Sequence, residues 1–249
     1  MNRHPPSNRI WVCTLTTLLL GTSLAHSQSV CSSDSQAQPQ ALFERFINAD
    51  CATCWADTAT PTAPPGALVL DWIVPGDQGD EAALSAAASS DALARLQDVQ
   101  RARPDTQDRH DSRVDPLPGA TLRVARGPAV ANYVGVSVTL TLPQGASPAL
   151  PLSGWVVLVQ ALPSGVEGSP VSRNIIRNAF QPIWNVGNVL SNKEQLRFHE
   201  LRAMSIPERV QADSLTVVAW IQDAHGRILA AAQSVCPPED KTEPGTQTR

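Results

Sequence analysis

The sequence predicts a chain of the α+β class, with an α/β unit in its first half and an antiparallel β-sandwich in its second half. Two observations predict the α/β unit. Strand-like and helix-like segments alternate between residues 41 and 103, and the run "ALVLDWIV" at 67–74 is almost wholly apolar, as buried parallel strands are. The sandwich is predicted by the short segments of alternating polarity that follow residue 120.

The first 27 residues have the composition of a secretory signal peptide. Arg3 and Arg9 precede the apolar run "WVCTLTTLLL", and small residues follow it, where cleavage after Ala25 or Ser27 is expected. The run is too short to span a bilayer, so we expect no membrane-spanning segment. The mature chain is therefore expected to be periplasmic or secreted, and to begin with a polar lead-in at 28–40.

The α/β unit is expected at 41–103. Its first strand is "ALFERFI", 41–47, which is followed by a turn that contains two cysteines and opens a short helix. The prolines of "PTAPPG" at 61–66 end this helix, because three prolines cannot continue one. The apolar run at 67–74 then forms the second strand.

A longer helix is expected to begin at Glu81 and to end near Arg103, just before Pro104. Asp80 can cap its first turn, and Ala92, Leu93, Leu96 and Val99 form one apolar stripe at three- and four-residue steps. The Ser-Ser-Asp sequence at 89–91 marks a point where this helix would divide in two.

A polar linker is expected at 104–119, and the β-sandwich at 120–236. The predicted strands are "TLRVAR", "ANYVGVSVTLTL", "GWVVLVQAL", "SRNIIRNAF" and the hairpin "LTVVAWIQDAHGRILAAAQ". The segment "SNKEQLRFHELRAM" at 191–204 fits both a capped helix and a strand. We favour the strand because both flanks are β, and we expect a disordered tail at 237–249.

Cysteine positions favour two disulfides. Cys13 leaves with the signal peptide, so that Cys31, Cys51, Cys54 and Cys236 remain. An even number of cysteines in an exported chain suggests complete pairing, and four cysteines allow three pairings. We favour a local Cys51–Cys54 bond and a Cys31–Cys236 bond that joins the chain ends, because the terminal pair lies in the similar settings "SQSVCSS" and "AQSVCPP".

The spacing Cys51-x-x-Cys54, placed after a strand and at the start of a helix, is typical of redox centres in thioredoxin-like folds. In such a centre the helix dipole stabilises the first thiolate, and the second cysteine resolves mixed disulfides. Cys51 is then the nucleophile and Cys54 the resolving residue. Asp71, in the second strand, is a candidate to carry a proton to and from Cys54, although an acid at that place also fits a structural role.

The stretch "LFERFINADCATCWAD" resembles a group of exported bacterial thioredoxin-like proteins classed as a domain of unknown function. Their corresponding stretch reads V-E-L-F-T-S-x-G-C-S-S-C-P-P-A-D, and "VLDWIVPGD", "SRNIIRNAFQPI" and the final hairpin are also similar to segments of that group. The resemblance implies a truncated thioredoxin-like unit at 41–103 followed by a β domain. Asp50 stands where that group has glycine, and its carboxylate opposes formation of a thiolate at Cys51.

Two functions remain open from the sequence. In the first, the protein exchanges disulfides with other exported thiol or disulfide proteins through Cys51 and Cys54. In the second, it is a non-catalytic envelope module with structural disulfides, whose β domain binds an unknown partner. The reduction potential of the pair distinguishes them, because a permanent disulfide resists glutathione-like couples.

Other classes of ligand are disfavoured. Two cysteines do not supply the four ligands of a zinc site, and His110 and His199 are the remote histidines that would have to complete it, so we expect no metal and no cofactor. The net charge of −4, which becomes more negative once two leader arginines are removed, argues against binding to nucleic acid. The sequence does not determine the oligomeric state.

Overall fold

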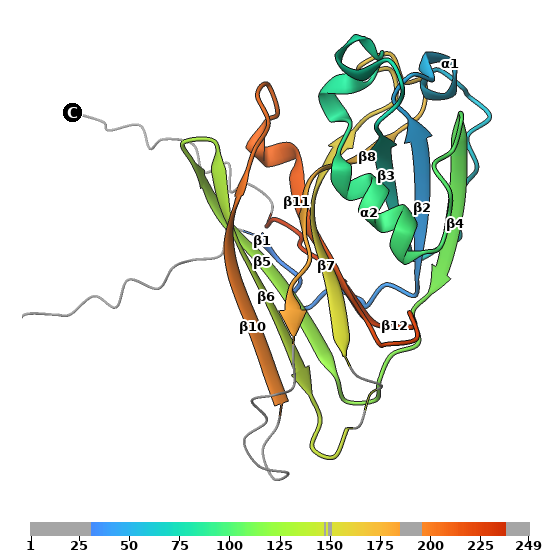
Figure 1. Ribbon diagram of the computed structural model, residues 1–249. Coiled ribbons are helices and arrows are strands. Elements are labelled where there is room, and N and C mark those ends of the chain that lie inside the picture. Colours follow the sequence, from blue (N-terminus) through green and yellow to red (C-terminus); the bar gives the residue numbers. More distant parts are fainter. Residues whose placement is uncertain (1–30, 147, 149–150, 185–195, 238–249) are drawn as a thin grey trace, which may run out of the picture.

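The computed structural model describes residues 31–146, 148, 151–184 and 196–237 of the 249-residue chain (Figure 1). The predicted signal peptide, and all of the predicted tail beyond residue 237, lie outside the described residues.

Two β-sheets that lie against each other make up most of the fold (Figure 1). The small sheet has the antiparallel order β1-β5-β6-β10. Its strands are β1 (Cys31–Ser32), β5 (Thr121–Val130), β6 (Tyr133–Leu142) and β10 (Leu196–Ser205). β10 lies in the ambiguous segment at 191–204, where we favoured a strand.

The large sheet has the order β12-β11-β7-β8-β3-β2-β4, and a short strand, β9, pairs with β7 off this line. Strand β3 is parallel to both β2 and β8, and the remaining neighbours are antiparallel. Its strands are β2 (Ala41–Asn48), β3 (Ala67–Val74), β4 (Gln107–Arg113), β7 (Leu152–Leu162), β8 (Arg173–Phe180), β9 (Ile183–Trp184), β11 (Leu215–Gln222) and β12 (Ile228–Gln233).

The predicted fold class is wrong. Strands hold 47% of the structure and helices only 12%, and the first half of the chain is not an α/β thioredoxin-like unit. Instead, β2 and β3 share the large sheet with five strands from the second half. The segment 104–119, for which we expected a linker, contains β4, which pairs with β2. Its sequence, "QDRHDSR", has no apolar residue, so hydrophobicity could not reveal this strand.

The predicted helix at 81–103 is also mostly wrong. Short 3-10 turns at Gly79–Glu81 (η1) and Ser85–Ala87 (η2) replace its first part, and the helix α2 spans only Ser90–Asp98. The side chain of Ser89 accepts a hydrogen bond from the backbone N of Asp91 at 3.0 Å and so begins a new helix, at the point where the sequence suggested a break.

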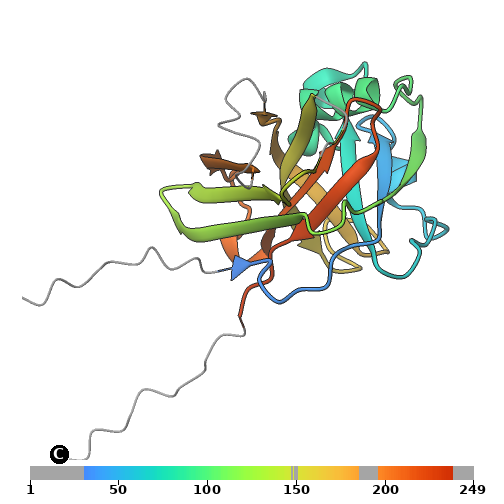
Figure 2. The ribbon, with the colours of Figure 1, turned by 90° about the horizontal axis from the view of Figure 1, so that it is seen from below.

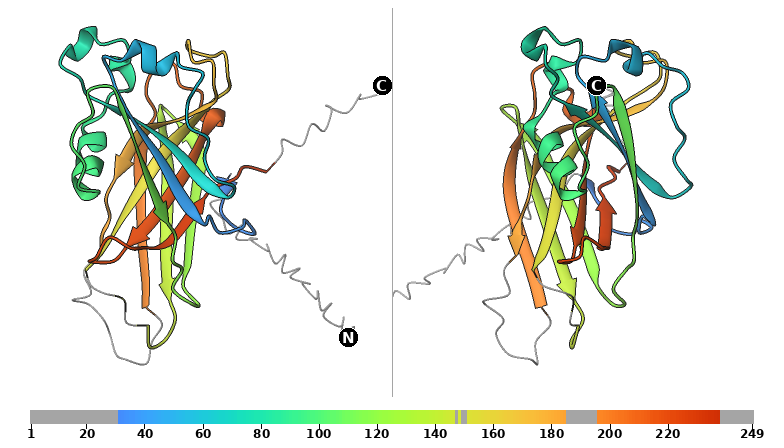
Figure 3. Two further views of the ribbon diagram at one scale, coloured as in Figure 1. Left: turned by 90° about the vertical axis from the view of Figure 1, so that its right-hand side faces the viewer. Right: turned by 45° about the vertical axis from the view of Figure 1, so that its right-hand side comes forward.

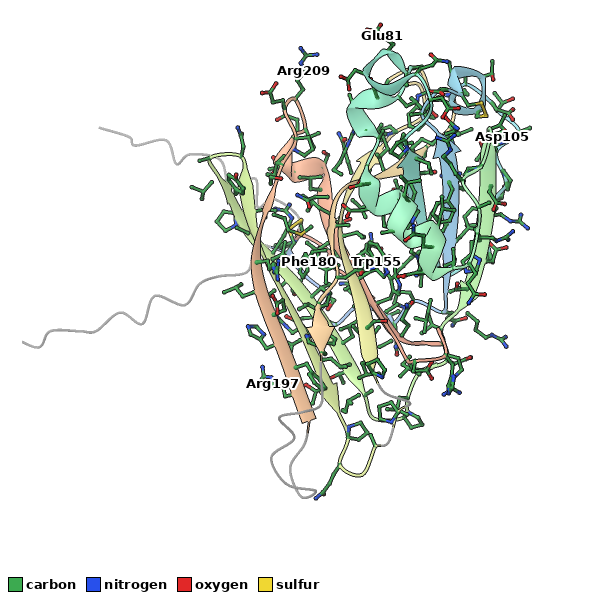
Figure 4. All side chains as sticks on the ribbon, in the orientation of Figure 1. Glu81, Asp105, Trp155, Phe180, Arg197 and Arg209 are labelled. Atoms are coloured by element: carbon green, nitrogen blue, oxygen red, sulfur yellow. A yellow bond between two sulfur atoms is a disulfide. The ribbon has the colours of Figure 1, made fainter. Side chains whose placement is uncertain are left out.

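Helix α2 packs on one face of the large sheet and buries three tryptophans against it (Figure 1). Trp72 and Trp155 meet edge to face at 5.5 Å between ring centroids, and Trp155 and Trp220 stack at 6.2 Å. Figure 4 places Trp155 and Phe180 at the centre of the molecule, and Glu81, Asp105, Arg197 and Arg209 at its periphery.

The opposite face of the large sheet has two coverings. The small sheet packs on β7 and β11 through an aliphatic core, and the helix α1 (Ala52–Trp55) and neighbouring loops cover the ends of β2 and β3. Alternate residues of a strand point to opposite faces, so Glu44 of β2 faces α2 whereas Arg45 faces the α1 side. No helix in the described ranges is long and apolar enough to cross a membrane.

Candidate functional site

The structure contains two disulfides, Cys31–Cys236 and Cys51–Cys54. This is the pairing that the sequence favoured. The first joins residues 205 positions apart, and backbone hydrogen bonds between Ser32 and Val235 lie next to it. Figure 2 shows β1 beside the segment that directly follows β12. The second disulfide lies at the end of β2 and is the candidate site.

The Cys51–Cys54 disulfide closes the single turn of α1. Cys51 is the N-cap of this helix, and its Sγ accepts a hydrogen bond from the backbone N of Cys54 at 3.2 Å. Cys51 is partly exposed, whereas Cys54 is 8% exposed and packs against Ile47 and Ile73 in a small apolar core. The pair is therefore asymmetric, with its first residue more exposed to solvent than its second.

Asp50 fixes the loop on one side of this turn. Its carboxylate accepts hydrogen bonds from the backbone N of Asp77 at 2.7 Å and of Gln78 at 3.3 Å. A Cβ atom at position 76 would overlap this carboxylate, which explains the glycine there. The sequence identified Asp50 only as a charge beside Cys51, because the loop that it binds lies 27 residues away.

Arg173 fixes the other side of α1 and was missed by the sequence analysis. Its Nη2 donates to the carbonyl oxygens of Trp55 and Cys54 at 3.0 and 3.3 Å, and its guanidinium lies 4.9 Å from the centroid of the Trp55 ring. The indole N–H of Trp55 donates to the carbonyl of Glu167 at 2.7 Å. Burial lowers the pKa of Arg173, and the nearby charge of Asp71 acts in the opposite direction.

Asp71 is fully buried and bound by arginine rather than by cysteine. Arg45 donates to its two carboxylate oxygens at 2.6 and 2.8 Å, and the backbone N of Asn174 donates at 2.6 Å. Nη1 of Arg173 lies 4.0 Å away. Within the described residues the carboxylate makes no hydrogen bond to Cys54, and Arg173 is the group that connects it to α1.

A cavity of about 190 Å³ lies beside α1. Its walls are mainly apolar, and the ion pair between Arg177 and Glu167, 3.5 Å apart, lies among them. The lining residues are Trp55, Ile73, Ala83, Leu84, Ala86, Ala87, Glu167, Ile175 and Arg177.

The two remote histidines do not meet. The Nδ1 of His199 lies 2.9 Å from the hydroxyl of Thr139 on the small sheet, and the Nε2 of His110 lies 2.9 Å from the hydroxyl of Ser112 on β4. Burial lowers the pKa of His110. The described part of the chain contains no group of three or more His, Cys, Asp or Glu residues that could hold a metal ion.

No family model matches the chain, and no curated protein matches it. The resemblance to the exported thioredoxin-like group therefore has no matching family model. Among solved structures, a domain of the outer membrane lipoprotein Omp28 from Porphyromonas gingivalis is similar, with 13% sequence identity and a TM-score of 0.28. The match covers 49% of this chain and 91% of that chain.

Proposed function

We propose that this chain is an exported, non-catalytic module of the cell envelope, in which both disulfides are permanent and the β-structure binds a partner. Two intramolecular disulfides are typical of proteins that fold in an oxidising compartment outside the cytoplasm. The apolar leader at 11–20 agrees with export.

The observation that carries this proposal is the fixed environment of α1. Arg173 holds its carbonyl groups, Trp55 is anchored to Glu167, and Asp50 binds the adjoining loop. A catalytic pair gains its reactive thiolate from a helix dipole, but α1 has only four residues and provides few aligned peptide groups. These contacts support a disulfide that stabilises a turn rather than one that opens and closes.

A redox titration tests this proposal. The protein, with both disulfides intact, is equilibrated in thiol buffers between about −120 and −270 mV, the range of known exchange proteins, and mass mapping of the alkylated peptides distinguishes the two pairs. Free thiols are then trapped by alkylation and counted by mass. We expect Cys51–Cys54 to stay oxidised throughout, and reduction within that range would contradict a permanent disulfide.

Thiol–disulfide exchange is the second candidate, and the asymmetric exposure of the pair favours it. In the reduced protein, the Cys51 thiolate would attack a disulfide of another exported protein and form a mixed disulfide. The Cys54 thiolate would then attack the Cys51 sulfur and release the partner as a dithiol, so that the partner gains the two electrons that the pair loses. Asp71 as proton carrier for Cys54 stays a prediction of this candidate, to be tested by the pH profile of exchange.

A further inference from the structure

A second cavity, of about 380 Å³, lies on the face of the large sheet that carries Arg45. Arg45 on β2 and Arg109 on β4 are directly opposite each other in the strand register, and both line the cavity. Pro61 closes one side from the loop between α1 and β3, which runs down beside the sheet in Figure 3. Gln107 and Asp108 complete the lining.

The interior next to this cavity carries an excess of positive charge. Arg45, Arg173 and Asp71 are 7%, 1% and 0% exposed, so two buried guanidinium groups share one buried carboxylate. Nη1 of Arg173 is buried and has no hydrogen-bond partner among the described residues. Burying charge without a partner costs free energy, so an anion held nearby would stabilise this arrangement.

Hydrogen-bond donors remain for such an anion at the cavity itself. Nε and Nη2 of Arg45 bind Asp71, which leaves Nη1 without a partner in the part of the chain that the structure describes. The guanidinium of Arg109 makes a half-exposed ion pair with Asp111, at 3.3 Å from Nε. Both guanidinium carbons lie within 6.0 Å of the centroid of the Phe43 ring, which supports the two groups from below.

We infer that this cavity, here called the Arg45–Arg109 pocket, binds a small organic carboxylate between the two guanidinium groups. Planar guanidinium groups match the two oxygens of a carboxylate and form charge-assisted hydrogen bonds with them. Like charges directly opposite each other on neighbouring strands are unfavourable, and a bound anion removes this repulsion.

Charge and size favour a carboxylate over phosphate. The buried cluster has an excess of one positive charge, and the carboxylate of Asp111, 3.3 Å from Nε of Arg109, opposes an anion of higher charge. The volume exceeds that of a carboxylate group alone and falls within the range of small-molecule sites. The ligand is therefore either a free acid with a small organic body or the C-terminus of a peptide, and the two share the same recognition chemistry.

This inference rests on the proposed function, because it names the ligand class that the non-catalytic module would bind. The two can fail separately. The redox titration depends on Cys51–Cys54, whereas the binding measurement uses the oxidised protein and does not depend on whether that pair exchanges.

The test is a calorimetric titration of the oxidised mature protein with propionate, and with propionamide as its neutral counterpart. A tri-alanine peptide with a free or an amidated C-terminus distinguishes a peptide end from a free acid. We expect saturable binding of propionate or of the free-acid peptide, and none of either amide. Arg109→Gln should weaken binding at least about tenfold, since it removes a charged hydrogen-bond donor.

Arg113→Gln is the matched control, because Arg113 lies on the same strand but does not line the pocket. It should leave the affinity unchanged, and circular dichroism should show both variants folded. Arg45→Lys keeps the positive charge but loses the planar guanidinium group that matches two carboxylate oxygens. If this variant folds, it should also bind the carboxylate more weakly. Absence of saturable binding, equal losses from Arg109→Gln and Arg113→Gln, or tighter binding of inorganic phosphate would each overturn the inference.

Discussion

Two adjacent residues of β2 form buried ion pairs on opposite faces of the large sheet. Glu44 and Arg45 are neighbours in sequence but point to opposite faces of the large sheet, and each is paired. Glu44 binds Arg95 of α2 through Nε at 2.9 Å and Nη2 at 2.7 Å, and so fastens the helix to the sheet. Arg45 binds Asp71, which in turn faces Arg173 and α1. The two coverings of the sheet thus depend on adjacent residues of one strand.

Asp71→Asn should strongly destabilise the protein, because it leaves the buried charges of Arg45 and Arg173 without a carboxylate. Breaking a buried ion pair from one side typically costs about 3–5 kcal/mol, and we expect a loss of this size in the unfolding free energy, measured by urea denaturation. Asp34→Asn is the control, because the Asp34–Arg123 pair is exposed and should contribute at most about 1 kcal/mol. Similar losses in both variants would refute this account of Asp71.

At the scale of elements, the sequence predicted a strand best where apolar residues recur. Strands β2, β3, β5, β6, β7, β8, β11 and β12 occur where their patterns placed them, whereas the short strand β9 was not predicted. β3 is parallel to its neighbours, as a continuous apolar run indicates. Strand β4 could not be predicted, because it is an edge strand of polar residues whose place depends on pairing with β2. Because β4 pairs with β2, the predicted linker at 104–119 is wrong.

At the candidate site, too, the sequence predicted what a local pattern encodes and missed what depends on distant contacts. Cysteine spacing and setting were enough to suggest both disulfides. The roles of Asp50 and Arg173 depend on contacts across 27 and more than 100 residues, which no local pattern encodes. The helix at 81–103 was predicted too long because its ends were placed from a cap at Asp80 and a stop at Pro104, whereas the apolar stripe occurs only at 92–99 and the Ser89 cap begins the helix there.

Ser89→Ala should therefore weaken α2. Loss of an N-cap side chain costs about 1 kcal/mol in unfolding free energy, within a range of about 0.5–2 kcal/mol, and chemical denaturation measures it. Ser90→Ala serves as the matched control, since Ser90 is exposed and occupies the first helical position rather than the cap. If the two variants were equally stable, the helix would not depend on Ser89.

At the scale of the whole molecule, the two disulfides act over very different spans. Cys31–Cys236 ties β1, at the edge of the small sheet, to the segment that follows β12 of the large sheet, and so connects the two sheets. Cys51–Cys54 closes one turn. In the chain-entropy model, the free energy that a disulfide contributes grows with the length of the loop that it closes.

Replacing Cys31 and Cys236 by serine should lower the unfolding free energy by about 5 kcal/mol, whereas replacing Cys51 and Cys54 should lower it by about 2 kcal/mol. Guanidinium denaturation of the two double variants under non-reducing conditions measures both. The reverse order of stabilities would show that the local contacts of α1, and not loop length, determine the contribution of each bond.

The Cys31–Cys236 disulfide can form only late, after the rest of the chain is available. In the proposed export of this chain, Cys31 cannot meet Cys236 until almost the whole chain has crossed to the oxidising side, because Cys236 follows every described strand of both sheets. Until then the thiols within its reach are Cys51 and Cys54, either of which could capture it. We therefore expect the native pairing to form directly when Cys51 and Cys54 pair with each other before Cys31 attacks either, and otherwise only after a wrong bond is reshuffled.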